Sequence, residues 1–342
     1  MTKHTMAAQV YPVWEPEQYR RAGPNDLVEL RPVPGGHSLF LEKRIIEALV
    51  YAIAMHEACH LSGPTGSAKT SLIEALALVP ENYLSVCQAL GLPTKPVKLY
   101  PVEMVTFEAP GELYQRRALS EGTTYDEPSR LVVALEDAER VKEHYAPVIW
   151  LREMGRVHSA SVQGGLLNLM STTDIVLPDE RRLDGRGIAW VADSNYQAER
   201  DATHTLVILD DALKRRFGVN LTLGYLGPEQ EIEVLAQIVE KTEGRPADRE
   251  VIRHVVRLVH VIRRYKEEGH LSSTPPPTIP NCLSMLRMIA SMPHMSLQQA
   301  ANNTLVGNPS RDDQKMFAAV FNEVFGLQEV ETEDFTMGNN LF

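Results

Sequence analysis

The sequence predicts an α/β protein: a parallel sheet flanked by helices, followed by a small, all-helical domain. Three observations predict it. Five apolar runs of strand length alternate with helical patterns, near residues 58–62, 97–106, 147–152, 188–193 and 219–224. A glycine-rich loop directly follows the first run and leads into a helical pattern. Beyond residue 226 the apolar residues recur only at helical spacing, over 228–242, 247–268, 280–292 and 311–325.

Composition narrows the class of protein. The chain has 342 residues, of which 44% are hydrophobic and 23% charged, enough for a substantial core. The net charge of −11 disfavours sequence-independent binding to nucleic acid. Three widely spaced cysteines are no disulfide framework and indicate a reducing compartment. With no secretory apolar segment at the N-terminus and no apolar run long enough to span a bilayer, we expect a cytoplasmic protein without a membrane partner.

The patterns divide the chain into four parts. The predicted parts are a proline-rich N-terminal arm over 1–35, an α/β domain over 36–225, a helical domain over 226–327 and an acidic C-terminal tail over 328–342.

A zinc-protease pattern and a phosphate-binding pattern adjoin in the segment HEACHLSGPTGSAKT. His56, Glu57 and His60 fit H-E-x-x-H, which binds zinc when one helix presents both histidines on one face. Residues 43–55 have a helical pattern, and residues 58–62 must then be strand or loop. We therefore expect His56 near a helix end and His60 in a strand, and a zinc protease remains a remote alternative.

The segment GPTGSAKTS nearly fits the phosphate-binding loop G-x-x-x-x-G-K-[ST]. In such a loop Lys69 reaches the β- and γ-phosphates of ATP, and the Thr70 hydroxyl binds Mg²⁺. Ala68 stands where the pattern has its second glycine, which costs about 1–2 kcal/mol if that position requires a positive φ. The predicted nucleotide-binding residues are Gly63, Pro64, Thr65, Gly66, Ser67, Ala68, Lys69, Thr70 and Ser71.

The run PVIWLRE supplies half of the acid pair that a phosphate-loop ATPase needs. Such a strand ends in an Asp that holds Mg²⁺ and a Glu that polarises the attacking water. Glu153 is present, but Arg152 occupies the Asp position. Because a guanidinium is always charged, it would repel Mg²⁺. Three arrangements follow: Thr70 and water alone hold Mg²⁺, Arg152 turns away, or Arg152 binds phosphate.

In this order, the motifs resemble those of the AAA+ ATPases over residues 40–300. Within that superfamily they are most similar to the MoxR-like branch, near the Q-type activators of nitric oxide reductase and Rubisco. FEAPGELYQRRALSEGTTYDEPSRLVVALEDA resembles the branch's hairpin insert, and DIVLPDERRLDG the hairpin before its sensor strand. The resemblance thus implies hairpin inserts near 107–130 and 174–187 of the α/β domain. GIAWVADSNYQ resembles the sensor strand, DDALKRRFGVN the A-L-x-x-R-F segment, and GYLGPEQE the entry into the lid.

The resemblance implies roles for particular residues. Glu153 would polarise water, and Asn195, the sensor at the end of its strand, would position that water near the γ-phosphate. Arg216, with Arg215 beside it, matches the arginine finger that acts in a neighbouring subunit's site. Relatives often carry a lid arginine where this chain has Asn281. The resemblance also implies ATP and Mg²⁺ as ligands and a ring, in the usual case a homohexamer.

Two functions of different classes follow from these observations. In the first, a MoxR-like ATPase uses its cycle to remodel or activate a partner protein, by analogy a client or a von Willebrand A-type protein. In the second, the chain is a pseudo-ATPase that holds nucleotide structurally. The departures at Ala68, Arg152 and Asn281 motivate this second hypothesis.

Overall fold

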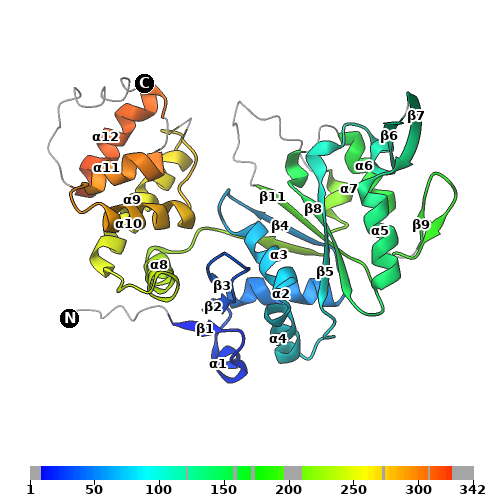
Figure 1. Ribbon diagram of the computed structural model, residues 1–342, viewed down its shortest axis with the longest axis horizontal. Helices are drawn as coiled ribbons and strands as arrows, with labels where there is room; N and C mark the ends of the chain where they lie inside the picture. Colours follow the sequence, from blue (N-terminus) through cyan, green and yellow to red (C-terminus); the bar gives the residue numbers. More distant parts are fainter. Residues whose placement is uncertain are drawn as a thin grey trace. The chain divides into compact units, whose positions relative to one another are not determined.

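The computed structural model describes residues 9–120, 122–156, 160–170, 174–195, 210–271, 274–306 and 309–325 (Figure 1). The chain divides into two compact units. The first spans Gln9–Tyr225, and the second begins at Leu226. Each unit is described by itself.

Five parallel strands form the central sheet of the first unit, in the order β12-β4-β11-β8-β5. Their bounds are Cys59–Gly63 for β4, Val97–Glu103 for β5, Ala146–Arg152 for β8, Ala189–Asn195 for β11 and Val219–Thr222 for β12. Each lies close to one of the five predicted runs. The predicted α/β fold, with a parallel sheet flanked by helices, is therefore confirmed. Because the strands are parallel, the carboxyl ends of β4, β11 and β8 meet at one edge.

Helices cover both faces of this sheet, and the strands alternate their side chains between them (Figure 1). On β8, Val148 and Trp150 pack on one face, whereas Ile149 and Leu151 pack on the other. The first face is covered by α2 (Lys43–Ala54), α3 (Lys69–Leu78) and α4 (Pro80–Leu90). The second is covered by α5 (Arg130–Val141), α6 (Ala160–Leu169) and α7 (Asp211–Lys214).

The N-terminal segment differs from the expected arm over 1–35. From residue 10 onward it forms a three-stranded sheet with one helix, comprising β1 (Val10–Pro12), α1 (Pro16–Arg21), β2 (Leu27–Leu30) and β3 (Leu39–Glu42). Val13, Tyr19 and Leu30 are buried in the same core as α2. Prolines suggested an extended arm, but Pro16 occupies the first turn of α1, where its missing N–H costs nothing.

Buried Asn82 on α4 ties this segment to helices α3 and α4. Its side chain bonds the backbone N–H and carbonyl of Arg31, at 2.8 and 3.0 Å, and the carbonyl of Ala75 at 2.9 Å. A fully buried amide with three hydrogen bonds fixes the approach of all three segments.

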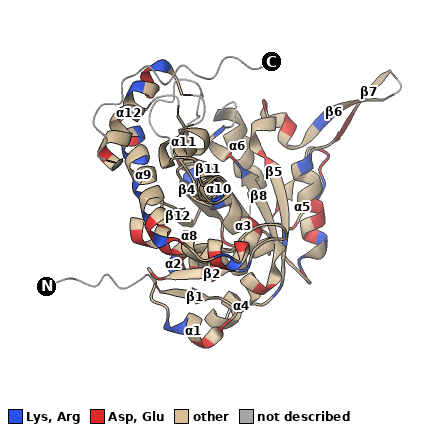
Figure 2. Ribbon diagram, turned by 60° about the vertical axis from the view of Figure 1, so that its left-hand side comes forward, with Lys and Arg blue, Asp and Glu red and all other residues tan. Residues whose placement is uncertain are grey.

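The first insert contains an antiparallel hairpin of β6 (Gln115–Ser120) and β7 (Thr123–Pro128), which projects beside α5 (Figure 2). Two short 3₁₀ turns precede this hairpin, η1 (Met104–Thr106) and η2 (Pro110–Leu113), and a third, η3 (Met154–Arg156), follows β8. Leu119 on β6 is 74% exposed. The hairpin therefore contributes little to the core, in contrast to the strands of the central sheet.

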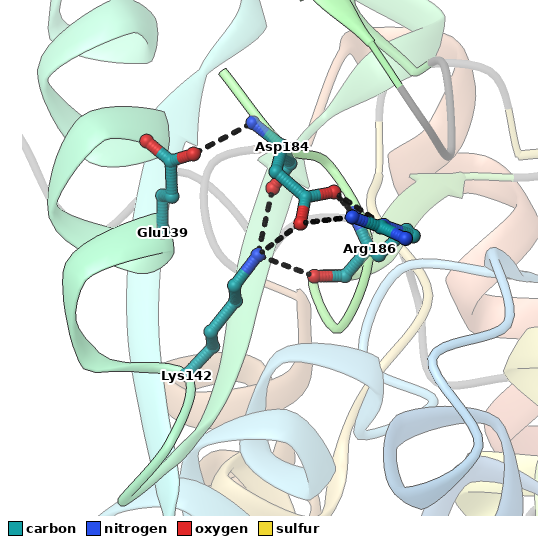
Figure 3. Close-up of polar contacts among 4 residues, drawn as sticks. All are labelled: Glu139, Lys142, Asp184 and Arg186. Carbon is teal, nitrogen blue, oxygen red and sulfur yellow. Dashed lines mark hydrogen bonds and ion pairs between the residues drawn. The ribbon is translucent and has the colours of Figure 1, made fainter.

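The second insert pairs β9 (Ile175–Val176) with β10 (Arg182–Leu183) and is fastened to the end of α5 (Figure 3). The Lys142 ammonium donates to the Asp184 carboxylate at 2.9 Å and to the carbonyls of Asp184 and Arg186. The Asp184 N–H donates to the Glu139 carboxylate at 2.7 Å. Hydrogen bonds from Arg186 and Lys142 hold the pKa of Asp184 well below its usual range, so the cluster persists at neutral pH.

In the described part of the second unit, the regular elements are all helical. They are α8 (Pro228–Glu243), α9 (Arg249–Glu267), α10 (Ile279–Ser291), α11 (Leu297–Ala301), the π-turn η4 (Asn302–Val306) and α12 (Arg311–Phe325). Buried Glu231 accepts from Arg263 at 2.9 Å and bonds His260 at 2.6 Å, which joins α8 to α9. Of the helices that the structure describes in either unit, none is long and apolar enough to cross a membrane.

Candidate nucleotide-binding site

A tight loop connects β4 to α3 at the edge where the parallel strands end. Gly66 and Ala68 have φ values of 80° and 66°, so two residues of this short loop are left-handed. A backbone of this kind forms a concave nest that gathers N–H groups for an anion. No side chain caps the first turn of α3. The loop and the start of the helix therefore present backbone N–H groups where a phosphate would bind.

Gly63 is required at the end of β4 because the neighbouring strand leaves no room for a side chain. A Cβ there would lie 2.2 Å from the Leu223 carbonyl oxygen and 2.8 Å from the Ser67 hydroxyl. The turn is also held from outside, since the Tyr225 hydroxyl donates to the Thr65 carbonyl at 2.8 Å. The first glycine of the motif is thus explained by close packing, and Ala68 does adopt the strained conformation that the motif reserves for glycine.

Lys69, the first residue of α3, is 6% exposed. Its ammonium donates to the carbonyls of Gly63 and Pro64, at 2.9 and 2.8 Å, and approaches the Ser67 hydroxyl at 3.3 Å. Burial lowers its pKa to about 8, and the Asp193 carboxylate works against this shift. The lysine is therefore a buried cation whose hydrogen bonds go to the loop itself.

The corner after β8 carries the predicted acid and the unexpected arginine. Arg152 pairs with Glu103 on β5, and its guanidinium lies 4.7 Å from the centre of the Trp150 ring. Because β5 and β11 flank β8 on opposite sides, the ion-pair partner of Arg152 lies on the side of β8 opposite to β11. Its contacts with Glu103 and Trp150 agree with one of the three expected arrangements, in which the arginine turns away. Glu153 has a φ of 51° and forms an ion pair with Arg156 at 3.0 Å.

Sequence reasoning missed the buried acid at this edge, Asp193 on β11. It is 5% exposed and accepts from the Trp150 indole N–H at 2.7 Å and from the Glu153 backbone N–H. Burial raises its pKa, while the charges of Lys69 and Arg152 oppose that shift. The sequence did contain a signal for this acid, because Asp193 is a charged residue within the buried, apolar strand AWVADSN, where a carboxylate is rare.

The other two predicted catalytic residues lie at opposite ends of the sheet. Asn195 ends β11 and pairs in register with Gly63, which places it beside the start of the loop. Arg216 is exposed in the turn that precedes β12, whose first residue pairs with the first residue of β4. The structure therefore brings Asn195 to the loop and keeps Arg216 at the far edge, where it cannot reach this chain's own loop.

The zinc-protease pattern is not on one helix. Helix α2 ends at Ala54, His56 follows in a left-handed turn with a φ of 59°, and His60 lies within β4. The His60 imidazole bonds the Ser194 hydroxyl at 2.8 Å, and burial lowers its pKa. Within the described residues, no group of three His, Cys, Asp or Glu could hold a metal ion. The two histidines are therefore accounted for by the turn and the sheet.

Asn281 has a local task at the start of α10. Its carbonyl accepts from the Thr278 N–H at 2.9 Å and from the Thr278 hydroxyl, and its amide donates to the Thr304 carbonyl at 3.2 Å. This is a capping box at the start of α10. Arg287 pairs with Glu243 at 2.6 Å, so it too serves the second unit itself.

The residues present fit a nucleotide phosphate. The left-handed loop, the uncapped helix start and buried Lys69 form a cradle for an anion. Thr70, the second residue of α3, places a hydroxyl beside that cradle, an oxygen ligand of the kind that Mg²⁺ prefers.

Comparisons with known proteins do not assign the chain to a family. No family model matches the chain, and no curated protein matches it. Among 613 matching chains of solved structures, one belongs to the complex of HORMA, CdnC and Trip13 from E. coli MS115-1. It is 15% identical, with a TM-score of 0.42, over 77% of this chain and 79% of that one. A likeness this distant does not bear on function.

Proposed function

We propose that this chain binds ATP with Mg²⁺ at the loop between β4 and α3 and hydrolyses it as a AAA+ ATPase of MoxR-like type. In this proposal it acts in a ring, in the usual case a homohexamer, and uses the cycle to remodel or activate a partner protein. The loop and Lys69 would hold the β- and γ-phosphates, and Thr70 would hold Mg²⁺. Bound Mg²⁺ would neutralise charge that develops on the phosphates.

One observation carries the proposal: the carboxyl ends of three adjacent strands bring the loop, Glu153 and Asn195 to one edge. Asn195 pairs with Gly63 in the sheet, and the backbone of Glu153 bonds Asp193 on the same strand as Asn195. Ligands of open α/β sheets bind at this edge. A buried lysine beneath left-handed backbone supports phosphate as the ligand.

The exposed position of Arg216 supports the ring. It lies at the edge of the sheet opposite the loop. An arginine there serves catalysis only if a neighbouring subunit presents its nucleotide to it. The client, by analogy a von Willebrand A-type protein or another partner awaiting activation, is the part of the proposal that rests on family resemblance alone.

The test is ATP binding and steady-state hydrolysis by the purified chain with Mg²⁺, beside Lys69→Ala and Glu153→Gln. We expect Lys69→Ala to weaken ATP binding by about 10- to 100-fold, the effect of losing charge-assisted hydrogen bonds. Glu153→Gln should bind ATP as the wild type does and hydrolyse it about 10²- to 10⁴-fold more slowly, because it loses a general base.

The matched control is Lys98→Ala, which removes a lysine of β5 that pairs with Asp137 on α5 and leaves the loop untouched. It should leave both binding and hydrolysis unchanged. Equal ATP binding by the wild type and Lys69→Ala would contradict the proposal.

A second candidate function is favoured by Arg152. An ion pair with Glu103 and stacking on Trp150 fix a cation at the corner where an ATPase keeps its acid. A ring subunit that only holds nucleotide would bind ATP tightly and show no difference in hydrolysis between wild type and Glu153→Gln. That outcome would select the pseudo-ATPase.

A further inference from the structure

The corner after β8 lacks an acid at position 152, but the same edge of the sheet holds a buried one. Asp193 lies one step beyond the pair Ala192–Leu151, which puts it level with Arg152 on the adjoining strand. Its hydrogen bond to Trp150 shows that both side chains lie on the same face. That face is the one covered by α3, the helix that begins with Lys69. A carboxylate therefore lies one strand away from the expected place, on the same side of the sheet.

The surroundings of Asp193 are built to keep a carboxylate in place. Two N–H donors, from the Trp150 indole and the Glu153 backbone, fix its orientation. Burial raises the pKa of Asp193, and the hydrogen bond from Trp150 and the charges of Lys69 and Arg152 oppose this rise. An ionised carboxylate has about four lone-pair sites, so two donors leave it able to accept more. The Arg152 guanidinium, which would otherwise compete for Asp193, pairs with Glu103 on β5, the strand on the other side of β8.

We propose that Asp193 replaces the acid missing at position 152 and is the carboxylate that faces the Mg²⁺ brought by ATP, directly or through its water ligands. The inference rests on the proposed function. Mg²⁺ prefers oxygen ligands and usually keeps several waters, so one carboxylate and the Thr70 hydroxyl suffice as the protein's share. The backbone N–H of Glu153 donates to Asp193, so Glu153 lies next to the proposed acid although the two residues are far apart in the sequence.

The competing reading is structural: Asp193 would serve only to satisfy the buried indole of Trp150. The two readings differ in what Asp193→Asn changes. The asparagine carbonyl can still accept from both N–H groups, so the structural reading predicts an altered thermal unfolding midpoint and nothing more. A role toward the cation predicts loss of the part of ATP affinity that depends on Mg²⁺.

The experiment measures the dissociation constant of ATP by titration calorimetry, once with Mg²⁺ and once with EDTA. The value in EDTA is divided by the value in Mg²⁺, and this ratio gives the gain in affinity that depends on Mg²⁺. We expect Asp193→Asn to reduce this ratio by about 10- to 100-fold, the effect of losing one charge-assisted contact. The double variant Arg152→Asp/Asp193→Asn returns an acid to position 152 and should recover most of the ratio. The control Asp184→Asn removes a hydrogen-bonded carboxylate of the second insert and should leave the ratio unchanged.

The outcomes separate this inference from the function on which it rests. If the wild type and Lys69→Ala bind ATP equally, both fall. If Lys69→Ala weakens ATP binding but Asp193→Asn leaves the ratio unchanged, only the role of Asp193 is overturned. The same holds if Mg²⁺ does not strengthen ATP binding by the wild type. Should Asp193→Asn fail to fold, Trp150→Phe removes one of its two donors and keeps an aromatic ring. A lower ratio then supports the inference, and an unchanged ratio overturns it.

Discussion

The loop after β4 and the corner after β8 lie at the same edge of one sheet but are built differently. In the loop, the cation is buried and the backbone itself forms the cradle, through Gly66 and Ala68. At the corner, the cation Arg152 is held toward β5, and the acid comes from the neighbouring strand. Backbone donors belong to one loop conformation and cannot be supplied from elsewhere. A carboxylate can come from either of two adjacent strand ends, so this half of the site tolerates rearrangement.

The largest effect should come from Gly63→Ala, which breaks the loop. The added Cβ meets the Leu223 carbonyl, a backbone atom that cannot move aside. We expect a loss of about 1–3 kcal/mol of unfolding free energy and loss of ATP binding. The control is Gly164→Ala on α6, where a Cβ meets no atom within 4 Å, and it should stabilise by about 0.5–1 kcal/mol. Equal effects of the two changes would contradict the packing argument. Urea unfolding and calorimetry measure both quantities.

A smaller effect is expected from Ala68→Gly, which relaxes the same loop. At a φ of 66° an alanine is strained and a glycine is not, so the variant should gain about 1 kcal/mol of stability. Ala134→Gly, in the interior of α5, should change stability in the opposite direction. Thermal unfolding without ATP measures both. A loss of stability in Ala68→Gly would show that the left-handed conformation is not the source of strain.

A comparable strain is stored at the corner, at Glu153 with its φ of 51°. Glu153→Gly should be about 1 kcal/mol more stable than Glu153→Gln, since both lose the carboxylate but only glycine removes the strain. Both variants should hydrolyse ATP about 10²- to 10⁴-fold more slowly than the wild type. Equal unfolding midpoints for the two variants would contradict the prediction and place the strain elsewhere.

The smallest effect concerns pH and Lys69. Its pKa is lowered from 10.5 to about 8, so between these values the unfolded chain carries a proton that the folded chain lacks. The stability of the wild type relative to Lys69→Met should therefore rise with pH across this window and be constant below it. The gain should stay well under about 1.4 kcal/mol per pH unit, the limit for one proton. Chemical unfolding at about pH 7.5 and about pH 9.5 measures it. A difference that stays flat over the window would argue against the lowered pKa.

The fold was largely predictable because the central strands are buried on both faces. A strand such as PVIWLR must be apolar throughout, which makes it visible without any tertiary knowledge. The N-terminal sheet was not predicted, since its strands are short and its prolines resemble those of an extended arm. The helix α11 and the π-turn after it were missed for a similar reason, because five-residue elements carry little periodicity.

The candidate site divides in the same way. Gly63, Lys69 and Thr70 belong to one contiguous segment, so spacing alone predicts them. Asp193 and its contacts with Trp150 and the backbone of Glu153 join residues about 40 positions apart, and only the order of the strands brings them together. The position of Arg152 depended on Glu103 in the same manner. Adjacent residues determine the conformation of a loop, so sequence spacing predicts it. The pairing of charges across a sheet depends on the order of the strands, which spacing does not give.

The bond between Trp150 and Asp193 has a spectroscopic consequence. An indole that donates to a carboxylate emits light whose wavelength and yield depend on the charge beside it. Trp150 is 1% exposed, so bulk solvent does not set its emission. The protein therefore carries an intrinsic optical probe next to its buried acid. Replacing Trp14 and Trp190 by phenylalanine would leave this single emitter, and its fluorescence would follow the electrostatic state of Asp193 in real time, without a label.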